Sequence, residues 1–166
     1  DGVVEVAAGS AHSCARIGVG ADSGGVCCWG NNAFGQLGDG TWTHRHGAVR
    51  VKGITTATAL SAHGTHTCAV LADTTVACWG NNNLGQLGDG TTIRRPDPVT
   101  VTGLTGVSAI DVGSLHTCAL LSDTTARCWG DNRNGQLGDG TTNYSLVPVA
   151  VTGLTSATSI TAGSAH

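Results

Sequence analysis

The sequence has no methionine, one phenylalanine and one tyrosine among its 166 residues, and only 11% of the residues are charged. Lysine and arginine number 8 against 11 aspartates and glutamates, so the net charge is −3. A chain with so little positive charge lacks the basic surface that binds phosphate backbones, and we expect no nucleic-acid partner. No apolar run approaches the ~20 residues of a transmembrane helix, so we expect no membrane span.

The chain begins at Asp1 and contains no methionine, so we expect that it is not the start of an open reading frame as translated. We expect it to have been processed, trimmed or excerpted. The residues present show no sign of a signal peptide, which would belong to a missing segment.

The sequence does contain a long repeat. Cys-Trp-Gly stands at 28–30, 78–80 and 128–130, a spacing of 50 each time (78 − 28 = 50 and 128 − 78 = 50), and Gly-Gln-Leu-Gly-Asp-Gly-Thr follows each copy. A fixed period of this length is typical of propellers, solenoids and arrays. Residues 1–166 therefore form a single array in this frame, with a partial blade at 1–27 and repeats at 28–77, 78–127 and 128–166.

Each repeat contains about four short β-rich runs. Residues 66–72 and 76–80 flank a short turn and predict a β-hairpin. A further run precedes the hairpin, as at 106–112, and another follows the Gly-rich loop, as at 98–102. No segment has a helical hydrophobic period of useful length. The sequence therefore predicts an all-β fold, a β-propeller of four-stranded antiparallel blades with about three blades present.

Six of the 7 cysteines occupy matching positions on the two arms of the hairpins. Directly opposed β-carbons lie ~4.5 to 5.5 Å apart in such pairs, close to the ~3.5 to 4.5 Å of a disulfide. We expect three intra-blade disulfides, and with them an oxidising compartment, outside the cell or on its surface. The alternatives are reduced, buried cysteines in a cytosolic protein, or zinc sites that borrow ligands from another blade. The predicted pairs are Cys14 with Cys28, Cys68 with Cys78, and Cys118 with Cys128.

Cys27 is the odd cysteine. Strand alternation places it on the face opposite Cys28, at the position of Ala77 and Arg127 in the other copies. Because that position accepts an arginine, we expect it at or near solvent. An intermolecular disulfide, a partner in a missing segment and an idle or locally buried thiol are the three interpretations of Cys27.

Taken together, Gly-x-x-His-Thr-Cys-Ala-Leu, the turn, and Cys-Trp-Gly-x-Asn-x-x-Gly-Gln-Leu-Gly-Asp-Gly-Thr resemble the repeat of the regulator of chromosome condensation family over nearly the whole chain. The resemblance implies a β-propeller, usually of seven four-stranded blades. The cysteine-bearing form is similar to bacterial members predicted to be exported. The family commonly has Asp-Gly at the hairpin turn; Asp73-Thr74 and Asp123-Thr124 here predict a longer or differently shaped turn.

Three repeats are too few for a closed ring of seven blades. An open arc leaves unpaired sheet edges and half-buried blade faces, which is unfavourable in water. We therefore expect a segment of a larger propeller, or a subunit that completes its ring or array with other copies. A dimer would carry roughly the repeats of one ring.

Four histidines share one register near the start of the hairpins. They could form a ring of metal-binding or proton-handling groups around the propeller axis, but successive blades separate them widely. Hydrogen bonding to the backbone of the same or a neighbouring blade is the structural alternative, which we favour because catalysis would also need a base, an orienting partner and an open site. We therefore predict no catalytic residue, no metal and no cofactor, and a structural role for His12, His66, His116 and His166.

The aspartate of each Gly-Asp-Gly-Thr suggests calcium, and residues 131–135 superficially resemble a calcium loop. Arg133 occupies a position where that loop needs an oxygen ligand, so the match fails. Turn formation explains the motif better, because Asp and Gly both favour such loops. The glycines do not form a phosphate loop either, since no Lys-Ser/Thr or helix follows them. The aspartates concerned are Asp39, Asp89 and Asp139.

The repeats differ most just after the Asp-Gly-Thr turn. Variation on one rim of a repeat scaffold commonly marks the binding face, and Trp, Tyr and Arg dominate interface hot spots. Tolerated loop drift is the alternative. Residues 143–145 also form an N-glycosylation sequon, so a glycan at Asn143 is a candidate modification. The predicted binding rim comprises Trp42, His44, Arg45, His46, Arg94, Arg95 and Tyr144.

The sequence favours a non-enzymatic, exported module that binds a protein or glycan, or packs with copies of itself into a surface structure. No nucleophile, base and orienting group converge in the repeat frame. The alternative is a regulator or inhibitor of a partner enzyme. In the resembled family, nuclear members promote nucleotide exchange on a small GTPase and bind chromatin, and an exported relative inhibits β-lactamase. A metal-dependent enzyme with histidines at the propeller axis is the third hypothesis.

Overall fold

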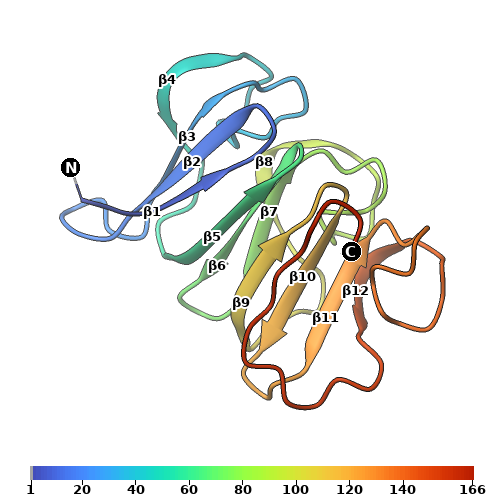
Figure 1. Cartoon of the computed structure of the whole chain (residues 1–166). Coiled ribbons are helices and arrows are strands. Elements are labelled where there is room, and N and C mark those ends of the chain that lie inside the picture. The colour runs from blue at the N-terminus through green and yellow to red at the C-terminus, as the bar shows by residue number, and fades with distance from the viewer. Residues whose placement is uncertain (1) are drawn as a thin grey trace.

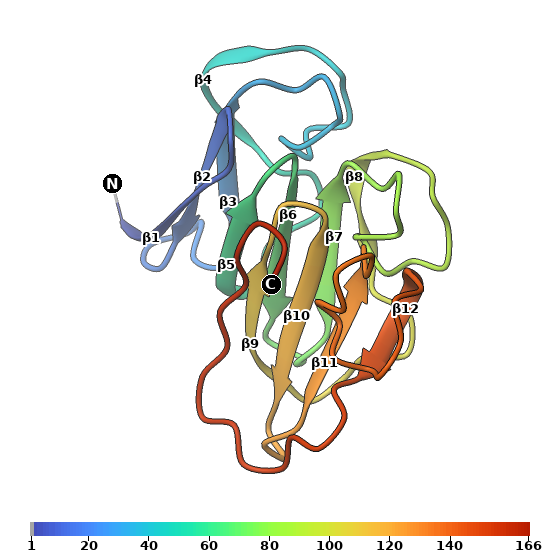
Figure 2. The same cartoon turned by 45° about the vertical axis from the view of Figure 1, so that its right-hand side comes forward.

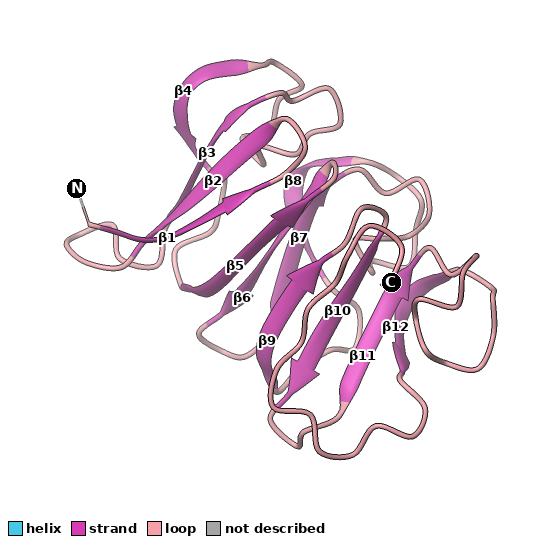
Figure 3. Ribbon diagram, in the orientation of Figure 1, coloured by secondary structure: helices cyan, strands magenta, loops and turns pink. Residues whose placement is uncertain are grey.

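The computed structural model describes residues 2–166, which form twelve β-strands and no helix (Figures 1 and 3). The strands make three four-stranded antiparallel sheets, each built from four consecutive strands. Blade 1 contains β1 (Val3–Ala8), β2 (His12–Ile17), β3 (Val26–Gly30) and β4 (Arg45–Arg50). Blade 2 contains β5 (Ala57–His63), β6 (His66–Leu71), β7 (Val76–Gly80) and β8 (Arg95–Thr100). Blade 3 contains β9 (Val107–Val112), β10 (His116–Leu121), β11 (Ala126–Gly130) and β12 (Ser145–Ala150).

The blades follow one another in an open arc, which confirms the predicted all-β propeller architecture. In both Figure 1 and Figure 2 the first strands of the blades, β1, β5 and β9, run along one side of the arc. The last strands, β4, β8 and β12, run along the other. Within residues 2–166 no helix is long and apolar enough to cross a membrane.

Each Cys-Trp-Gly lies at the end of the third strand of a blade, in β3, β7 and β11. A 50-residue block counted from this tripeptide therefore contains the fourth strand of one blade and the first two strands of the next. Because each block is shared between neighbouring blades, the sequence repeat and the structural repeat are out of phase. Residues of one block meet across the boundary between two sheets.

The hydrophobic core lies between the blades. One cluster joins blades 1 and 2 around Leu37 and Trp79, and a second joins blades 2 and 3 around Leu87 and Trp129. Both tryptophans are fully buried, whereas Trp29 of blade 1 is only half-buried. Burial of the indole therefore depends on a neighbouring blade.

The hairpin turns place threonine in the left-handed backbone region, with φ of +66° at Thr74 and +68° at Thr124. That region is adopted readily by glycine and is costly for a β-branched residue. Asp73 stabilises the first turn: its Oδ1 accepts hydrogen bonds from the Thr75 amide at 3.1 Å and the Thr75 hydroxyl at 2.6 Å. An aspartate thus holds a turn in which threonine takes a backbone conformation that glycine adopts more readily.

Candidate functional site

The loop between the third and fourth strands of each blade, residues 31–44, 81–94 and 131–144, is called the rim loop here, and a buried asparagine fixes each one. Asn32 Oδ1 accepts from the Leu37 amide at 3.0 Å, and its Nδ2 donates to the Thr41 carbonyl at 2.9 Å and to Asp39 Oδ1 at 3.3 Å. Asn82 and Asn132 make the corresponding bonds in the next two blades. The three rim loops therefore share one backbone path, held by side chains that the solvent does not reach.

Two of the three Gly-Asp-Gly-Thr aspartates, Asp39 and Asp89, tie the rim loop to the first residue of the strand that follows it. Asp39 Oδ1 accepts from the Thr41 amide at 2.9 Å and the Thr41 hydroxyl at 2.7 Å, and Oδ2 pairs with Arg45 Nε at 2.9 Å. Burial alone would raise the pKa of Asp39, but these hydrogen bonds and the Arg45 charge outweigh it, so the pKa lies below its ordinary value. Asp89 and Arg95 repeat the pair.

The aspartate oxygens are therefore engaged within the loops. In residues 2–166 no group of three or more His, Cys, Asp or Glu side chains is placed to hold a metal ion. Of the predicted rim residues, Arg45 and Arg95 are half-buried and their charges are neutralised by their aspartates, whereas Arg94 and His46 are exposed. His44 is exposed, but its Nδ1 accepts a hydrogen bond from the Asn32 amide at 2.8 Å.

Large side chains project from the rim loop of each blade. Trp42 is 50% exposed, Ile93 60% and Tyr144 56%. They lie in equivalent loops before β4, β8 and β12. The rim therefore presents an apolar or aromatic side chain on every blade in the arc.

A cation–π contact joins two of these loops. The Arg94 guanidinium lies 4.6 Å from the centroid of the Phe34 ring, and Arg94 Nε donates to Asn83 Oδ1 at 3.1 Å. The predicted binding rim includes neither Phe34 nor Ile93, although Ile93 lies in a segment where the repeats differ. Comparison of the copies could have found Phe34, because the equivalent positions hold Leu84 and Asn134.

Two of the four histidines at equivalent positions, His12 and His66, connect neighbouring blades. Nε2 of His12 lies 2.8 Å from Thr67 Oγ1, and the Thr67 hydroxyl donates to the Gln36 carbonyl at 3.1 Å. Because that hydroxyl proton is directed to Gln36, His12 donates from Nε2 and its Nδ1 is unprotonated. Nε2 of His66 contacts the Thr117 hydroxyl in the same way at 2.9 Å.

These imidazoles are removed from solvent. Burial lowers the pKa of His12 to about 4, and burial together with the neighbouring histidines His12, His116 and His63 lowers that of His66 to about 3. Burial also lowers the pKa of His116, whereas His166 is exposed. The buried histidines are therefore neutral at pH 7, and His12 and His66 bind across the blade boundary.

The predicted disulfides are confirmed: Cys14–Cys28, Cys68–Cys78 and Cys118–Cys128 are bonded. Each links directly opposed residues of the second and third strands of a blade. Cystines of this kind are typical of an oxidising compartment.

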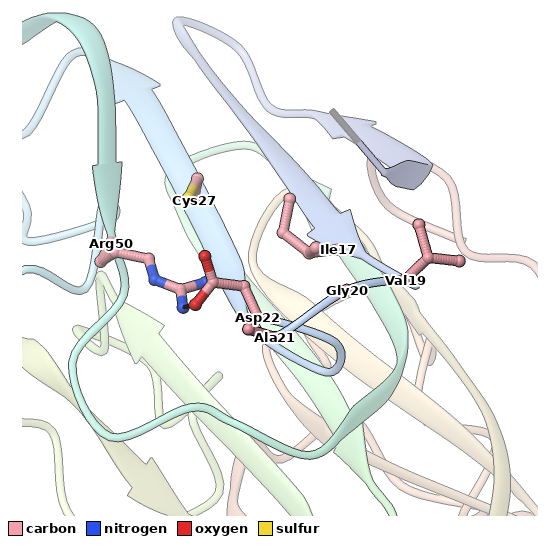
Figure 4. Close-up of a pocket in the computed structure, with 7 residues that line it drawn as sticks. All are labelled: Ile17, Val19, Gly20, Ala21, Asp22, Cys27 and Arg50. Atoms are coloured by element: carbon pink, nitrogen blue, oxygen red, sulfur yellow. Dashed lines mark hydrogen bonds and ion pairs between the residues drawn. The ribbon is translucent and has the colours of Figure 1, made fainter.

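Cys27 is a free, half-buried cysteine. It lines an open pocket of about 370 Å³ together with Ile17, Val19, Asp22 and Arg50. Figure 4 shows the Asp22 carboxylate and the Arg50 guanidinium pointing toward each other beside the thiol, and they form an ion pair. The Cys27 side chain is thus partly exposed, at a position that the sequence predicted to lie at or near solvent.

Solved structures with the same architecture are found in yeast and plants. Prp20p from Saccharomyces cerevisiae matches with a TM-score of 0.77 and 19% identity over 98% of this chain and 42% of that one. The ectodomain of the receptor kinase ACR4 from Arabidopsis thaliana matches with a TM-score of 0.55 and 20% identity over 98% and 43%. That of CR4 from Physcomitrella patens gives 0.55 and 24% over 97% and 35%. This chain thus spans less than half of each.

No curated protein is similar enough to count as a match. The family description "Regulator of chromosome condensation (RCC1) repeat" matches residues 23–70, 75–120 and 128–166, and a second description of the same repeat matches 107–136. These matches cover most of the chain and include all three Cys-Trp-Gly marks. With its four-stranded blades and its repeat frame, the chain belongs to the RCC1 repeat family.

Proposed function

We propose that the chain is a non-enzymatic interaction module whose rim binds a protein partner outside the cell or on its surface. The observation that carries the proposal is the row of Trp42, Ile93 and Tyr144, each at least half exposed. Exposed apolar side chains gathered on one surface mark interaction sites, and Trp, Tyr and Arg dominate binding hot spots.

The loops beneath this row are already ordered. Asn32, Asn82 and Asn132 hold them from below through bonds to three or more points of the same loop. A rigid loop loses little conformational entropy when it binds. Arg94, stacked on Phe34, places a positive charge at the surface beside the apolar row. A guanidinium in this position suits a partner that presents a carboxylate or carbonyl group to it.

The proposed location rests on the three cystines, because such bonds persist in oxidising compartments. Support for a protein partner comes from a relative: the structure of Prp20p is described with its binding to Gsp1p and histones. The alternative function, regulation or inhibition of a partner enzyme, would use the same rim. Capture of an enzyme as the partner would favour this alternative.

Affinity capture from extracellular and surface fractions tests the proposal. The bait is the intact chain, compared with Trp42→Ser/Tyr144→Ser and with a matched control, Val4→Ser/Val19→Ser, which alters exposed apolar residues of blade 1 outside the rim loops. We expect a captured protein whose yield falls about tenfold or more with the rim variant and is unchanged with the control. Equal capture by all three baits would contradict a binding rim.

A further inference from the structure

The positive charges of the chain are, with one exception, engaged by other residues. Arg127 forms no ion pair and no side-chain hydrogen bond within residues 2–166. Arg94 stacks on Phe34 and donates to Asn83. The other arginines and the single lysine form ion pairs: Arg16 with Glu5, Arg45 with Asp39, Arg50 with Asp22, Lys52 with Asp97, Arg95 with Asp89 and Arg133 with Asp131.

Arg127 lies in a pocket at the boundary between blades 2 and 3. It is the second residue of β11 and is half-buried. The pocket has a volume of about 300 Å³ and is also lined by Leu121, Pro148 and residues 103–105. Residues 103–105 belong to the segment that joins β8 to β9, so both blades and their connection form the pocket (Figure 1). The rim loop of blade 3 follows the opposite end of β11, so the pocket is separate from the rim.

The boundary between blades 1 and 2 shows that packing does not require an arginine at this position. Ala77, the counterpart of Arg127, is 5% exposed and packs in the apolar cluster between those blades. The other pocket residues have the same or similar counterparts there, namely residues 53–55, Leu71 and Pro98. One position therefore distinguishes an apolar boundary from one that holds a charged pocket.

The carboxylate of the adjacent hairpin turn is engaged within that turn. Asp123 Oδ1 accepts hydrogen bonds from the Thr125 hydroxyl at 2.7 Å and from the Thr125 amide at 3.0 Å. These bonds lower the pKa of Asp123, and the charge of Arg127 adds to the effect without an ion pair. Asp73 makes the same bonds in blade 2, where alanine replaces Arg127. The turn therefore holds its aspartate with or without the arginine, and the Arg127 donors are free.

The lining of the pocket indicates the chemistry of its ligand. A planar guanidinium presents a fork of N–H donors that matches the two oxygens of one carboxylate. Leu121 and Pro148 add apolar surface, and the exposed Thr105 adds a hydroxyl group. Phosphate groups are typically bound by clusters of arginines, and Arg127 is the only cation among the described lining residues.

We propose that this pocket binds a short aliphatic carboxylate, with the Arg127 guanidinium on the carboxylate and with Leu121 and Pro148 against the carbon chain. A volume of about 300 Å³ is at the small end of ligand sites and suits a group of this size. Two sources carry this group: a free aliphatic acid and the glutamate side chain of a protein. Because the pocket is separate from the rim, the proposal does not rest on the proposed function.

An NMR titration of the isotope-labelled intact chain with sodium butyrate, at constant ionic strength, tests the proposal. We expect saturable shifts of the Arg127 Nε–H signal and of the Gly103 and Thr105 amides, with a dissociation constant on the order of 1 mM. Propylamine, a short aliphatic chain of opposite charge, will leave these signals unchanged. Inorganic phosphate will bind less tightly than butyrate, because the pocket offers it a single cation.

Two variants of equal net charge locate the site. Arg127→Ala introduces the residue that blade 2 has at this position and will abolish the saturable shifts. Arg133→Ala removes an exposed arginine from the rim loop of the same blade and will leave the shifts unchanged. Unchanged signals elsewhere in the spectrum verify that each variant has folded.

A second titration, with glutamate capped at both ends, distinguishes the two sources of the carboxylate. Tighter binding of the capped glutamate than of butyrate assigns the site to a protein ligand, and tighter binding of butyrate assigns it to a free acid; either order supports the pocket. Shifts that grow linearly with butyrate concentration overturn the proposal. Saturation that survives Arg127→Ala, or tighter binding of phosphate than of either carboxylate, also overturns it.

Discussion

Single glycines determine how closely one blade approaches the next. Gly38 and Gly88 have φ of +67° and +70°, and a Cβ on either would lie 2.8 Å from an atom of the Trp79 or Trp129 indole. The loop backbone therefore lies directly on the indole whose N–H the preceding glutamine carbonyl accepts. Neither alanine nor any larger residue fits there without displacing the tryptophan.

The third repeat provides a matched control for this contact. Gly138 has a similar φ of +64°, but a Cβ there would meet only Val151, at 3.0 Å or more. Gly88→Ala and Gly138→Ala both incur the left-handed backbone cost, and only Gly88→Ala also displaces an indole. We expect Gly88→Ala to lose about 1–3 kcal/mol more of the unfolding free energy in urea titrations. Equal losses would show that the indole contact is not the constraint.

At the scale of the element, each blade is a sheet whose second and third strands are covalently joined. The cystine positions follow from antiparallel pairing, because Cys68 and Cys78 are direct neighbours across β6 and β7. Both cysteines are fully buried in the cluster between blades 2 and 3. Each disulfide therefore contributes both a crosslink and packing volume.

Replacement of one bridge will measure the crosslink. Cys68→Ala/Cys78→Ala is expected to lower the unfolding free energy by about 2–4 kcal/mol, since the unfolded chain regains the entropy of an open loop. Cys27→Ala, which changes a free cysteine, will change it by less than about 0.5 kcal/mol. Urea unfolding under non-reducing conditions compares the two. A bridge variant as stable as the parent would assign the cysteines a packing role only.

At the scale of the whole molecule, neutral histidines hold the blades together. His12 donates to Thr67 across the first boundary, and His66 to Thr117 across the second. Protonation would place a charge in each boundary with no carboxylate bonded to it. The stability of the arc should therefore depend on pH in the range where free histidine titrates.

The sign follows from the depressed pKa values. The folded values, about 4 for His12 and about 3 for His66, lie below the ordinary 6.5, so the unfolded chain binds protons first as the pH falls. The contribution of the neutral histidines to the unfolding free energy is complete above pH ~6.5. It is lost as the pH falls toward 4, by at most ~1.4 kcal/mol per pH unit for each histidine. Aspartates such as Asp39, with pKa values below the ordinary 3.8, affect stability only at lower pH.

Urea titrations at several pH values between 7.5 and 4.5 test this dependence. The unfolding free energy should fall steadily below pH 6.5, with a shallower slope in His66→Gln and an unchanged slope in His46→Gln, which alters an exposed histidine. A free energy that stays constant down to pH 4.5 would contradict the buried neutral histidines.

The sequence by itself determined the features that depend on near neighbours in the chain. Strand alternation and a turn between two β-rich runs place Cys68 opposite Cys78, so hairpin, register and disulfide followed from local pairing. The differences between copies likewise singled out Trp42 and Tyr144, both of which the structure leaves at least half exposed.

Only the tertiary structure decided what neighbouring blades do to one another. Trp79 and the Gln36 carbonyl are 43 residues apart and meet across a blade boundary that no local pattern specifies. The same holds for Arg94 on Phe34, and for Arg45, whose charge Asp39 neutralises. Which repeated residues are buried, and which faces are left open, depends on packing between sheets, and hydrophobic period and spacing describe only one sheet at a time.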